Sequence, residues 1–403
     1  RVAEQDYILV GERYKVDKSL DTTYPVVPLS DICEINAENK NPTLAFGDDE
    51  FIYIDISSVE NGTGKVDFSN KIKGTDAPSR AKRAVKKGDI LFSTVRPNLK
   101  AYGYVEREDC DCCVASTGFA VISAKTMVLS KYVYYMLYSE PVQIQLASMM
   151  GKGAYPSVNQ KDVSQIQIPL PSLSIQEDFV AELDSYQKII DGARQVVENY
   201  KPTIQNNSHW ETARLGDICE LNPRKSEVKD FEGDVSFAPM AVISDTGMYF
   251  SAQEKKPLKE VYTGYTYFRD NDVLLAKVTP CFENGKSGLA KNLENGIGFG
   301  SSEFFVLRAN PDRVLPEYIY YIINSNRFIS EGTPQMTGTG GLRRLTKDFV
   351  RNFPVSLPPL DEQRKIVNQT EEEIAIVEQN KHLIEIFEKK ISDKISEVWG
   401  EKQ

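Results

Sequence analysis

Histidine is nearly absent from this chain: its 403 residues include only His209 and His382. Neither histidine is paired with a plausible nucleophile, so histidine-based catalysis is not expected. No apolar run reaches the roughly 18 residues that a membrane-spanning helix needs. The cysteines follow no regular disulfide framework, and a chain of this length folds without one. We therefore expect reduced cysteines in a cytoplasmic protein. The cysteines are Cys33, Cys110, Cys112, Cys113, Cys219 and Cys281.

Catalytic and metal-binding motifs are also missing. The segment 222–225 (Asn-Pro-Arg-Lys) begins like the Asn-Pro-Pro-aromatic motif of adenine methyltransferases but departs at its third residue. The segment 285–287 (Gly-Lys-Ser) ends like a phosphate-binding loop, but Pro280 stands where that loop needs glycine. The run 110–113 has three cysteines, yet no matching Cys or His pair exists for zinc, so a reduced loop is favoured. We expect no catalytic centre, no metal and no cofactor in this chain.

The charge is unevenly distributed. The net charge of −10 taken alone argues against nucleic acid as a partner. Between Lys65 and Lys100, however, ten Lys or Arg stand against three Asp. The two long helices described below are acidic. The chain is thus divided into basic patches and acidic supports, although a basic run alone is equally typical of a solvated face.

The strongest signal is an internal duplication with offsets of 183 to 187 residues. The order of the matched segments is kept, which indicates two copies of a whole domain rather than a short repeat. Such pseudo-twofold symmetry suits a ligand with two half-sites. The matches are 29–36 with 215–222, 88–91 with 271–274, 132–135 with 318–321, and 168–171 and Gln176 with 355–358 and Gln363.

Each copy has the same predicted layout. Short β-type runs come first, followed by a helix at about 130–150 in one copy and 316–330 in the other. Ser130 is suited to cap the first helix, and Pro316 to open the second. A Gly-rich loop, a strand and a pair of prolines then follow. The tyrosine pairs 134–135 and 320–321 are interpreted as core residues rather than as base-stacking ones.

Each copy ends in a long helix with one apolar seam, which needs a partner helix; its own duplicate is the simplest partner. The first seam contains Ile175, Phe179, Leu183, Tyr186, Ile190, Ala193, Val197 and Tyr200. The second contains Val367, Ile374, Val377, Ile384, Phe387, Ile391, Ile395 and Val398, and is interrupted by Thr370 and Lys381.

These observations predict an α+β fold with two pseudo-symmetric α/β domains separated by two long helices that pack against each other as a coiled coil. The predicted boundaries are an N-terminal extension at 1–27, a first domain at 28–172 and a first spacer helix at 173–205. The second domain follows at 206–359 and the second spacer helix at 360–403.

In this arrangement the chain resembles the specificity subunit of type I restriction-modification systems. The segments that carry the resemblance are 88–97, 279–286, 168–176 and 355–363. The second proline joint matches the family pattern closely, whereas Ser174-Ile175 replaces the usual acidic pair in the first. The resemblance covers about residues 28 to 399.

The resemblance implies that the two domains are target-recognition domains, each of which reads one half of a split double-stranded DNA target. It also implies that the two long helices between them pack as an antiparallel coiled coil. The helices would bind two methyltransferase subunits, which supply adenine-N6 methylation with S-adenosylmethionine, and a motor-nuclease restriction subunit can join them. The segment 6–14 resembles the end of a methyltransferase domain, and the sequence begins at Arg1. Two alternatives therefore stay open, a separate subunit and the specificity region of a fused single-chain enzyme. A third interpretation, from another class, is a protein-binding scaffold without DNA readout.

Binding to DNA would begin with phosphates, which Lys and Arg contact without reading sequence. The predicted phosphate contacts are Arg80, Lys82, Arg83, Lys86, Lys87, Arg343, Arg344 and Lys347. Base reading needs polar side chains on loops that reach the major groove. The predicted readers are Arg96, Asn98, Lys100, Lys152, Tyr155, Ser157 and Asn159 in the first copy, and Lys277, Thr279, Asn284 and Lys286 in the second.

Overall fold

The computed structural model describes residues 22–150, 156–200, 209–243, 247–252, 254–339 and 341–400. The chain forms two compact units, each of which is described by itself. Unit 1 comprises residues 1–195 and 381–403, and unit 2 comprises residues 196–380. No helix in the described ranges is both long and apolar enough to cross a membrane.

The described strands of unit 1 form two four-stranded sheets and one short pair. The first sheet has the order β2-β9-β6-β7, with bounds Cys33–Ile35, Phe119–Ala124, Ile90–Ser93 and Tyr102–Tyr104. The second has the order β4-β3-β8-β5, with bounds Lys71–Lys73, Glu50–Ile54, Cys113–Ser116 and Ala81–Ala84. The pair joins β1 (Val26–Pro28) to β10 (Gln167–Pro169).

Unit 2 repeats this order. Its first sheet is β12-β20-β17-β18-β14, with bounds Cys219–Leu221, Phe304–Ala309, Val273–Ala276, Ser287–Ala290 and Tyr249–Phe250. Its second is β15-β13-β19-β16, with bounds Glu254–Pro257, Asp234–Ala238, Ile297–Gly300 and Thr266–Arg269. A short pair again joins β11 (Glu211–Arg214) to β21 (Pro354–Leu357). The duplication in the sequence is therefore a duplication of topology, and the predicted fold class is confirmed.

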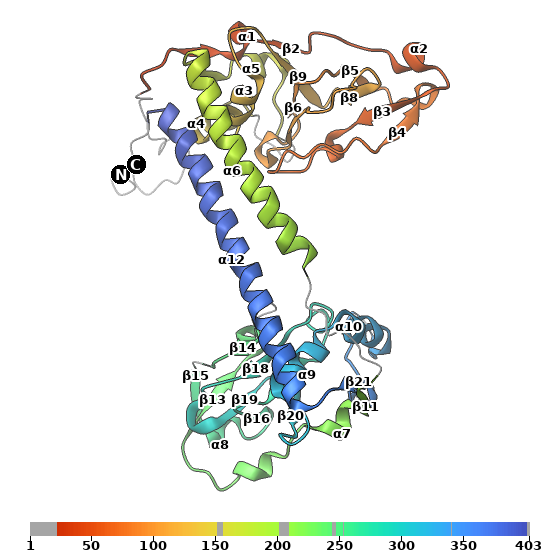
Figure 1. Ribbon diagram of the computed structural model, residues 1–403, viewed down its shortest axis with the longest axis vertical. Coiled ribbons are helices and arrows are strands. Elements are labelled where there is room, and N and C mark those ends of the chain that lie inside the picture. Colours follow the sequence, from red (N-terminus) through yellow and green to blue (C-terminus); the bar gives the residue numbers. More distant parts are fainter. Residues whose placement is uncertain are drawn as a thin grey trace. The chain divides into compact units, whose positions relative to one another are not determined.

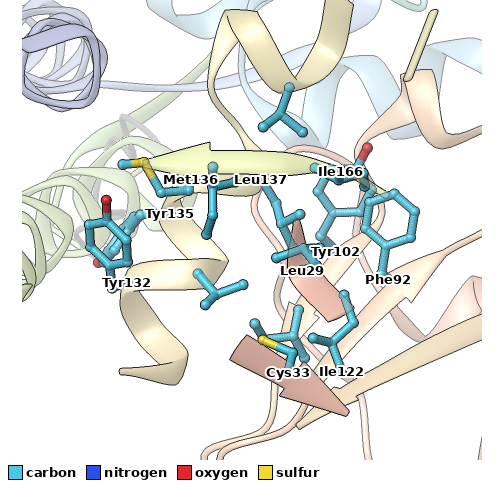
Figure 2. Packing of buried hydrophobic residues seen from close by; sticks show 14 of the residues in the cluster. Leu29, Cys33, Phe92, Tyr102, Ile122, Tyr132, Tyr135, Met136, Leu137 and Ile166 are labelled. Atoms are coloured by element: carbon cyan, nitrogen blue, oxygen red, sulfur yellow. The ribbon is translucent and has the colours of Figure 1, made fainter. Parts of the chain in front are cut away.

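The central strand of each first sheet is buried on both faces. In β6, Ile90 and Phe92 belong to one apolar cluster, whereas Leu91 belongs to another on the opposite face. The alternation follows from the period of two along a strand. Figure 2 shows the first cluster, in which Tyr132 and Tyr135 from α3 (Ser130–Leu137) pack near the sheet. Tyr135 and Tyr321 are buried, in agreement with a core role.

The helices predicted at 130–150 and 316–330 are each broken into two. In unit 1, α3 ends at Leu137 and α4 (Glu140–Met149) begins with Pro141 in its first turn. A proline inside a continuous helix would lack its N–H and clash with the preceding turn, so the chain breaks before it. In unit 2, α9 (Pro316–Ile323) is followed by α10 (Asn326–Gly332), which Ser325 caps by accepting from the Phe328 N–H.

Pro316 occupies the first turn of α9, as predicted, but the cap assigned to Ser130 was wrong. The N-cap residue of α3 is Leu129, and its side chain makes no capping hydrogen bond. The Ser130 hydroxyl donates instead to the Gly88 carbonyl oxygen. The local motif could not show this, because the acceptor lies 42 residues away.

A buried glutamine of the long helix bonds to the backbone at the start of α3. Gln176 lies in α6 (Leu173–Asn199) and is fully buried. Its Oε1 accepts from the Leu129 N–H at 2.8 Å, and its Nε2 donates to the Pro171 carbonyl oxygen at 2.9 Å. The side chain thus fastens the start of α3 to the proline joint and the long helix.

Gln363 repeats the arrangement in unit 2, at the start of α12 (Leu360–Val398). Its Oε1 accepts from the Leu315 N–H at 2.9 Å. Its Nε2 donates to the carbonyl oxygens of Pro358 and Arg313, at 2.8 and 2.9 Å. The two amides are equivalent members of the duplicated frame.

In unit 1, α6 and the last part of α12 lie side by side (Figure 1) and run in opposite directions. The carboxylate of Glu182 accepts from Lys394 Nζ at 3.0 Å, and one turn later the Tyr186 ring lies 5.3 Å from that of Phe387. In unit 2, the hydroxyl of Tyr200 donates to Glu373 of α12. The helices pack together as predicted.

The seam itself needs one correction. Ile175 is exposed, with 41% of its surface accessible, because Gln176 occupies the buried position beside it. The remaining seam residues are buried or half-buried. Buried ones are Phe179, Leu183, Ile190, Ala193, Val367, Ile395 and Val398; half-buried ones are Tyr186, Val197, Tyr200, Ile374, Val377, Ile384, Phe387 and Ile391.

We expect Gln363→Leu to lower the free energy of unfolding by about 3 kcal/mol. Leucine keeps the volume but removes the partner of one N–H and two carbonyl oxygens, of which only the Pro358 oxygen makes a fully buried bond. Each lost bond therefore costs about 1 kcal/mol, the low end of the range for unsatisfied groups. Urea unfolding followed by circular dichroism measures the change. The matched control is Gln369→Leu on the same helix, where the amide is exposed and bonds only to Glu373. Equal midpoints for the two variants would show that the buried amide is not a structural joint.

Candidate DNA-recognition surface

In unit 1, the loop that follows β6 is held against the segment at 156–159. Val95 and Ser157 form an isolated β-bridge. The Arg96 N–H donates to the Pro156 carbonyl oxygen at 2.8 Å, and the Val158 N–H donates to that of Thr94 at 3.0 Å. We call segments 94–100 and 156–159 the paired loops of unit 1. They bring together five of the predicted base readers, which are Arg96, Asn98, Lys100, Ser157 and Asn159.

Unit 2 builds the same pair after β17. The bridge there joins Val278 to Arg344. The Thr279 N–H donates to the Arg343 carbonyl oxygen at 3.0 Å, and the Leu345 N–H donates to that of Lys277 at 2.7 Å. The paired loops of unit 2 are therefore segments 277–286 and 341–345. The three backbone links occupy equivalent places in the two units, so the frame is shared even where the side chains differ.

The paired loops of unit 1 contain two side chains on left-handed backbone. Arg96 has φ +48° and Lys100 has φ +55°, and they flank the short helical turn Pro97–Leu99. Residues other than glycine adopt this conformation at a cost of about 1 kcal/mol or more, and such residues concentrate at functional sites. Arg96 and Asn98 are exposed. Asn98 and Lys100 line a cavity of about 340 Å³ beside α4.

Three of the predicted contacts in the first copy either serve the fold or lie outside the described residues. The Asn159 side-chain oxygen accepts from the N–H groups of Lys161 and Asp162, so it caps α5 (Gln160–Ser164). Ser157 is exposed beside it. Lys152 and Tyr155, in the predicted Gly-rich loop, lie outside the described residues.

The predicted phosphate contacts of unit 1 lie on and after β5. Arg80 and Lys82 are exposed. Arg83 is half-buried and donates to Asn39 Oδ1 at 2.9 Å, and burial lowers the pKa of its guanidinium. Lys86 pairs with Glu38 at 2.9 Å, and Lys87 pairs with Glu108; hydrogen bonds to these carboxylates raise the pKa of both lysines. This strip therefore combines free and carboxylate-paired cations.

In unit 2 the arginines of the paired loops are neutralised by carboxylates. Arg344 donates two hydrogen bonds to Glu303, at 2.9 and 2.8 Å, and this pairing lowers the pKa of the Glu303 carboxyl. Arg343 donates to Glu283 at 3.2 Å, and the Thr279 hydroxyl donates to the same Glu283 oxygen at 3.1 Å. Each of these arginines thus already shares its charge with a carboxylate, although its guanidinium has further N–H donors.

The other predicted residues of unit 2 are dispersed around these loops. Lys277 donates to the Ser302 carbonyl oxygen at 2.7 Å, and burial lowers the pKa of its ammonium. Asn284 is exposed and Lys286 is half-buried at the end of the first loop. Lys347 is exposed in the first turn of α11 (Lys347–Asn352).

No sequence motif singles out Lys225, which lies beside Lys277 in the structure. Both side chains line one groove in unit 2. Lys225 ends the segment 222–225, whose only apparent interest was a failed match to a methyltransferase motif. The available signal was the repeat itself, because Lys40 stands near the equivalent position, 185 residues earlier.

Within the described ranges, no three His, Cys, Asp or Glu side chains come together in a way that could hold a metal ion. All six cysteines are unpaired. Burial raises the pKa of Cys33 and of Cys219 to about 12, so both thiols stay protonated. Each of the two units presents one pair of polar loops, and equivalent backbone bonds hold the loops together in both. This arrangement is typical of a protein that recognises a ligand in two parts.

Comparison with known proteins identifies that class. Residues 22–199 and 207–386 each match the family described as the type I restriction modification DNA specificity domain. The chain belongs to this family. Its members are specificity components of restriction-modification systems and not the catalytic ones, in agreement with the lack of catalytic motifs in the sequence.

Named relatives come from several bacteria. The EcoEI specificity subunit of Escherichia coli is 40% identical over 173 residues, which cover 43% of this chain and 29% of that subunit. The EcoAI subunit of the same species is 39% identical over the same coverage. The StySPI specificity subunit of Salmonella potsdam is 19% identical over 387 residues, or 87% of this chain and 81% of that protein. The alignments to the two E. coli relatives thus span less than a third of their length.

Solved structures share the fold. A chain from a study of complex assembly and conformational transition in the type I restriction-modification system aligns with a TM-score of 0.56 and 24% identity, covering 93% of this chain and 97% of that one. The type I S subunit from M. genitalium aligns with a TM-score of 0.52 and 11% identity, covering 96% and 99%. At these identities the likeness establishes the architecture of two domains and two long helices.

We expect Glu303→Gln to strengthen the binding of duplex DNA by about two- to fivefold, the effect of freeing one exposed charge worth 0.4–1 kcal/mol. The substitution removes the carboxylate that holds Arg344 and leaves the guanidinium available to a phosphate. Fluorescence anisotropy with a labelled duplex measures the change. Glu254→Gln, which removes a carboxylate paired with Lys256 on β15, is the matched control for net charge. Unchanged or weaker binding by Glu303→Gln alone would contradict the assignment of Arg344 as a phosphate contact.

Proposed function

We propose that this chain binds double-stranded DNA at a bipartite, asymmetric target and directs adenine-N6 methylation and restriction there by partner subunits. The observation that supports the proposal most directly is the pair of equivalent loop frames with different side chains. Family membership supports DNA recognition by each copy. That each copy reads a different half-site is the part of the proposal that goes beyond family membership.

The two sets of loops offer different chemistry on one scaffold. Unit 1 presents Arg96, Asn98 and Lys100, which donate hydrogen bonds. Unit 2 presents Thr279, whose hydroxyl donates to Glu283, and the exposed amide of Asn284, beside an arginine that pairs with Glu283. Base pairs differ in the major groove by their pattern of donors and acceptors. Two such different surfaces would read different sequences.

We further propose that two methyltransferase subunits dock on the long helices and that S-adenosylmethionine binds to them and not to this chain. The acidic outer faces of α6 and α12 and their exposed Ile189 and Ile376 support a protein partner. A motor-nuclease subunit would join the same assembly. The roles are the same whether the methyltransferase is a separate subunit or part of a fused chain.

The exchange of residues 28–170 for the corresponding segment of a related specificity subunit tests this function. With a methyltransferase partner supplied, the methylated motif should change in one half and keep the other, because each unit carries its own loops and core. Sequencing of modified bases reads the outcome. The reciprocal exchange in unit 2 is the control and should alter only the other half. The chain without its partner should transfer no methyl groups.

If both halves change together when one segment is exchanged, the two units do not read separate half-sites. If the purified chain methylates DNA alone, its assignment as a non-catalytic component is wrong. If methylation by the partner proceeds without this chain at the same sites, the chain does not direct it.

A further inference from the structure

Unit 2 contains a groove of about 240 Å³ next to its paired loops. It lies where the segment after β12 crosses the edge strand β16, and Lys277 connects it to the first of the paired loops. The side chains that matter are Asn222, Lys225, Tyr265, Tyr267, Lys277 and Ser302. Two ammonium groups and an exposed tyrosine therefore line one depression.

Neither ammonium is neutralised by a carboxylate of the described chain. Lys225 Nζ donates to the Tyr262 carbonyl oxygen at 2.8 Å and lies 5.0 Å from the centre of the Tyr262 ring. Lys277 Nζ donates to the Ser302 carbonyl oxygen at 2.7 Å and lies 5.3 Å from the Phe305 ring. An ammonium has three donors, so both groups retain hydrogen atoms for a ligand.

The neighbouring arginines differ from these lysines because they are paired with carboxylates. Arg343 and Arg344 each bind a carboxylate of their own unit, Glu283 and Glu303. Glu303 acts on Lys277 only through the longer-range Coulomb attraction that opposes the effect of burial on the lysine pKa. The groove of unit 2 thus holds two ammonium groups that have no carboxylate within ion-pair distance among the described residues.

Unit 1 keeps positive charge in the same place with different residues. Its strand β5 is the counterpart of β16 in the sheet order. Lys40 Nζ donates to the Asp111 carbonyl oxygen at 2.6 Å and lies 5.1 Å from the Phe46 ring, as Lys225 does with Tyr262. Arg83 of β5 donates to Asn39 on the crossing segment. The duplicated frame therefore keeps the charge although the side chains have changed.

We propose that the groove of unit 2 binds one backbone phosphodiester of the DNA, held by Lys225 and Lys277 together. The proposal rests on the proposed function, that the chain binds duplex DNA. Lysine is suited to this task because it acts as a point charge and imposes no directional fork. Since Lys277 stands two residues before Thr279, a phosphate fixed here would set the register of the loop that reads the bases.

The test uses the double variant Lys225→Gln/Lys277→Gln of the full chain and a labelled duplex of random sequence, with affinity measured by fluorescence anisotropy over a range of KCl concentrations. We expect at least a roughly tenfold loss of affinity at low salt. We also expect the slope of log K against log salt to become shallower by about one, the value for one phosphate contact. The variant Lys225→Arg/Lys277→Arg keeps the charge and should keep the wild-type slope.

The matched control is Lys255→Gln, which removes one lysine from β15 at the opposite edge of the same sheet, where Lys255 pairs with Glu294. It should leave the slope unchanged. Wild-type affinity and slope in the double variant, with an unaltered urea midpoint, would overturn the proposal. If the wild-type chain itself bound no duplex, the proposed function would fail instead, independently of the groove.

Free phosphate is the other source of the same chemistry. Inorganic phosphate added at constant ionic strength should displace no more duplex from the wild type than KCl does, because a diester site contacts a long polyanion. Displacement by inorganic phosphate from the wild type but not from the double variant would show a site for free phosphate and overturn the assignment to the DNA backbone.

Discussion

The buried amide at the start of each long helix is the interaction on which the rest of each unit depends. Gln176 and Gln363 each satisfy a helix-start N–H and a carbonyl oxygen of the proline joint. A buried polar group without such partners would cost several kcal/mol, so the geometry of the joint is narrowly defined. This one side chain fixes the position of a recognition domain relative to the long helix that follows it. A specificity protein needs that relation, because its loops must meet bases at a defined register.

The net charge of the chain is −10, but its positive side chains are unevenly distributed. In unit 2, Glu283 and Glu303 pair with Arg343 and Arg344 of the paired loops. Salt bridges between partly exposed groups are individually weak, so we propose that a DNA phosphate replaces these carboxylates at little cost in free energy. Lys225 and Lys277 have no carboxylate within ion-pair distance among the described residues, which is why we propose their groove as a phosphate site.

The sequence predicted the duplication, the fold class and the two packed helices, because each depends on patterns that repeat along the chain. It failed where the decisive partner is distant in the sequence. Ser130 looked like a helix cap, yet its hydroxyl bonds to Gly88. Ile175 looked like a seam residue, yet its neighbour Gln176 is the buried one, because the Gln176 amide accepts from the Leu129 N–H, 47 residues away. The paired loops could be listed residue by residue, but their bridges, such as Val95 with Ser157, join segments some 60 residues apart. Which of their side chains touch DNA stays a prediction.

The central claim is that one duplicated frame carries two different readers. The most direct measurement is the sequencing of N6-methyladenine in DNA from cells that contain the chain and its methyltransferase partner. The account predicts one motif in two parts, separated by a gap of unspecified bases, with halves that differ in sequence. A single uninterrupted motif, or two identical halves in palindromic arrangement, would contradict it.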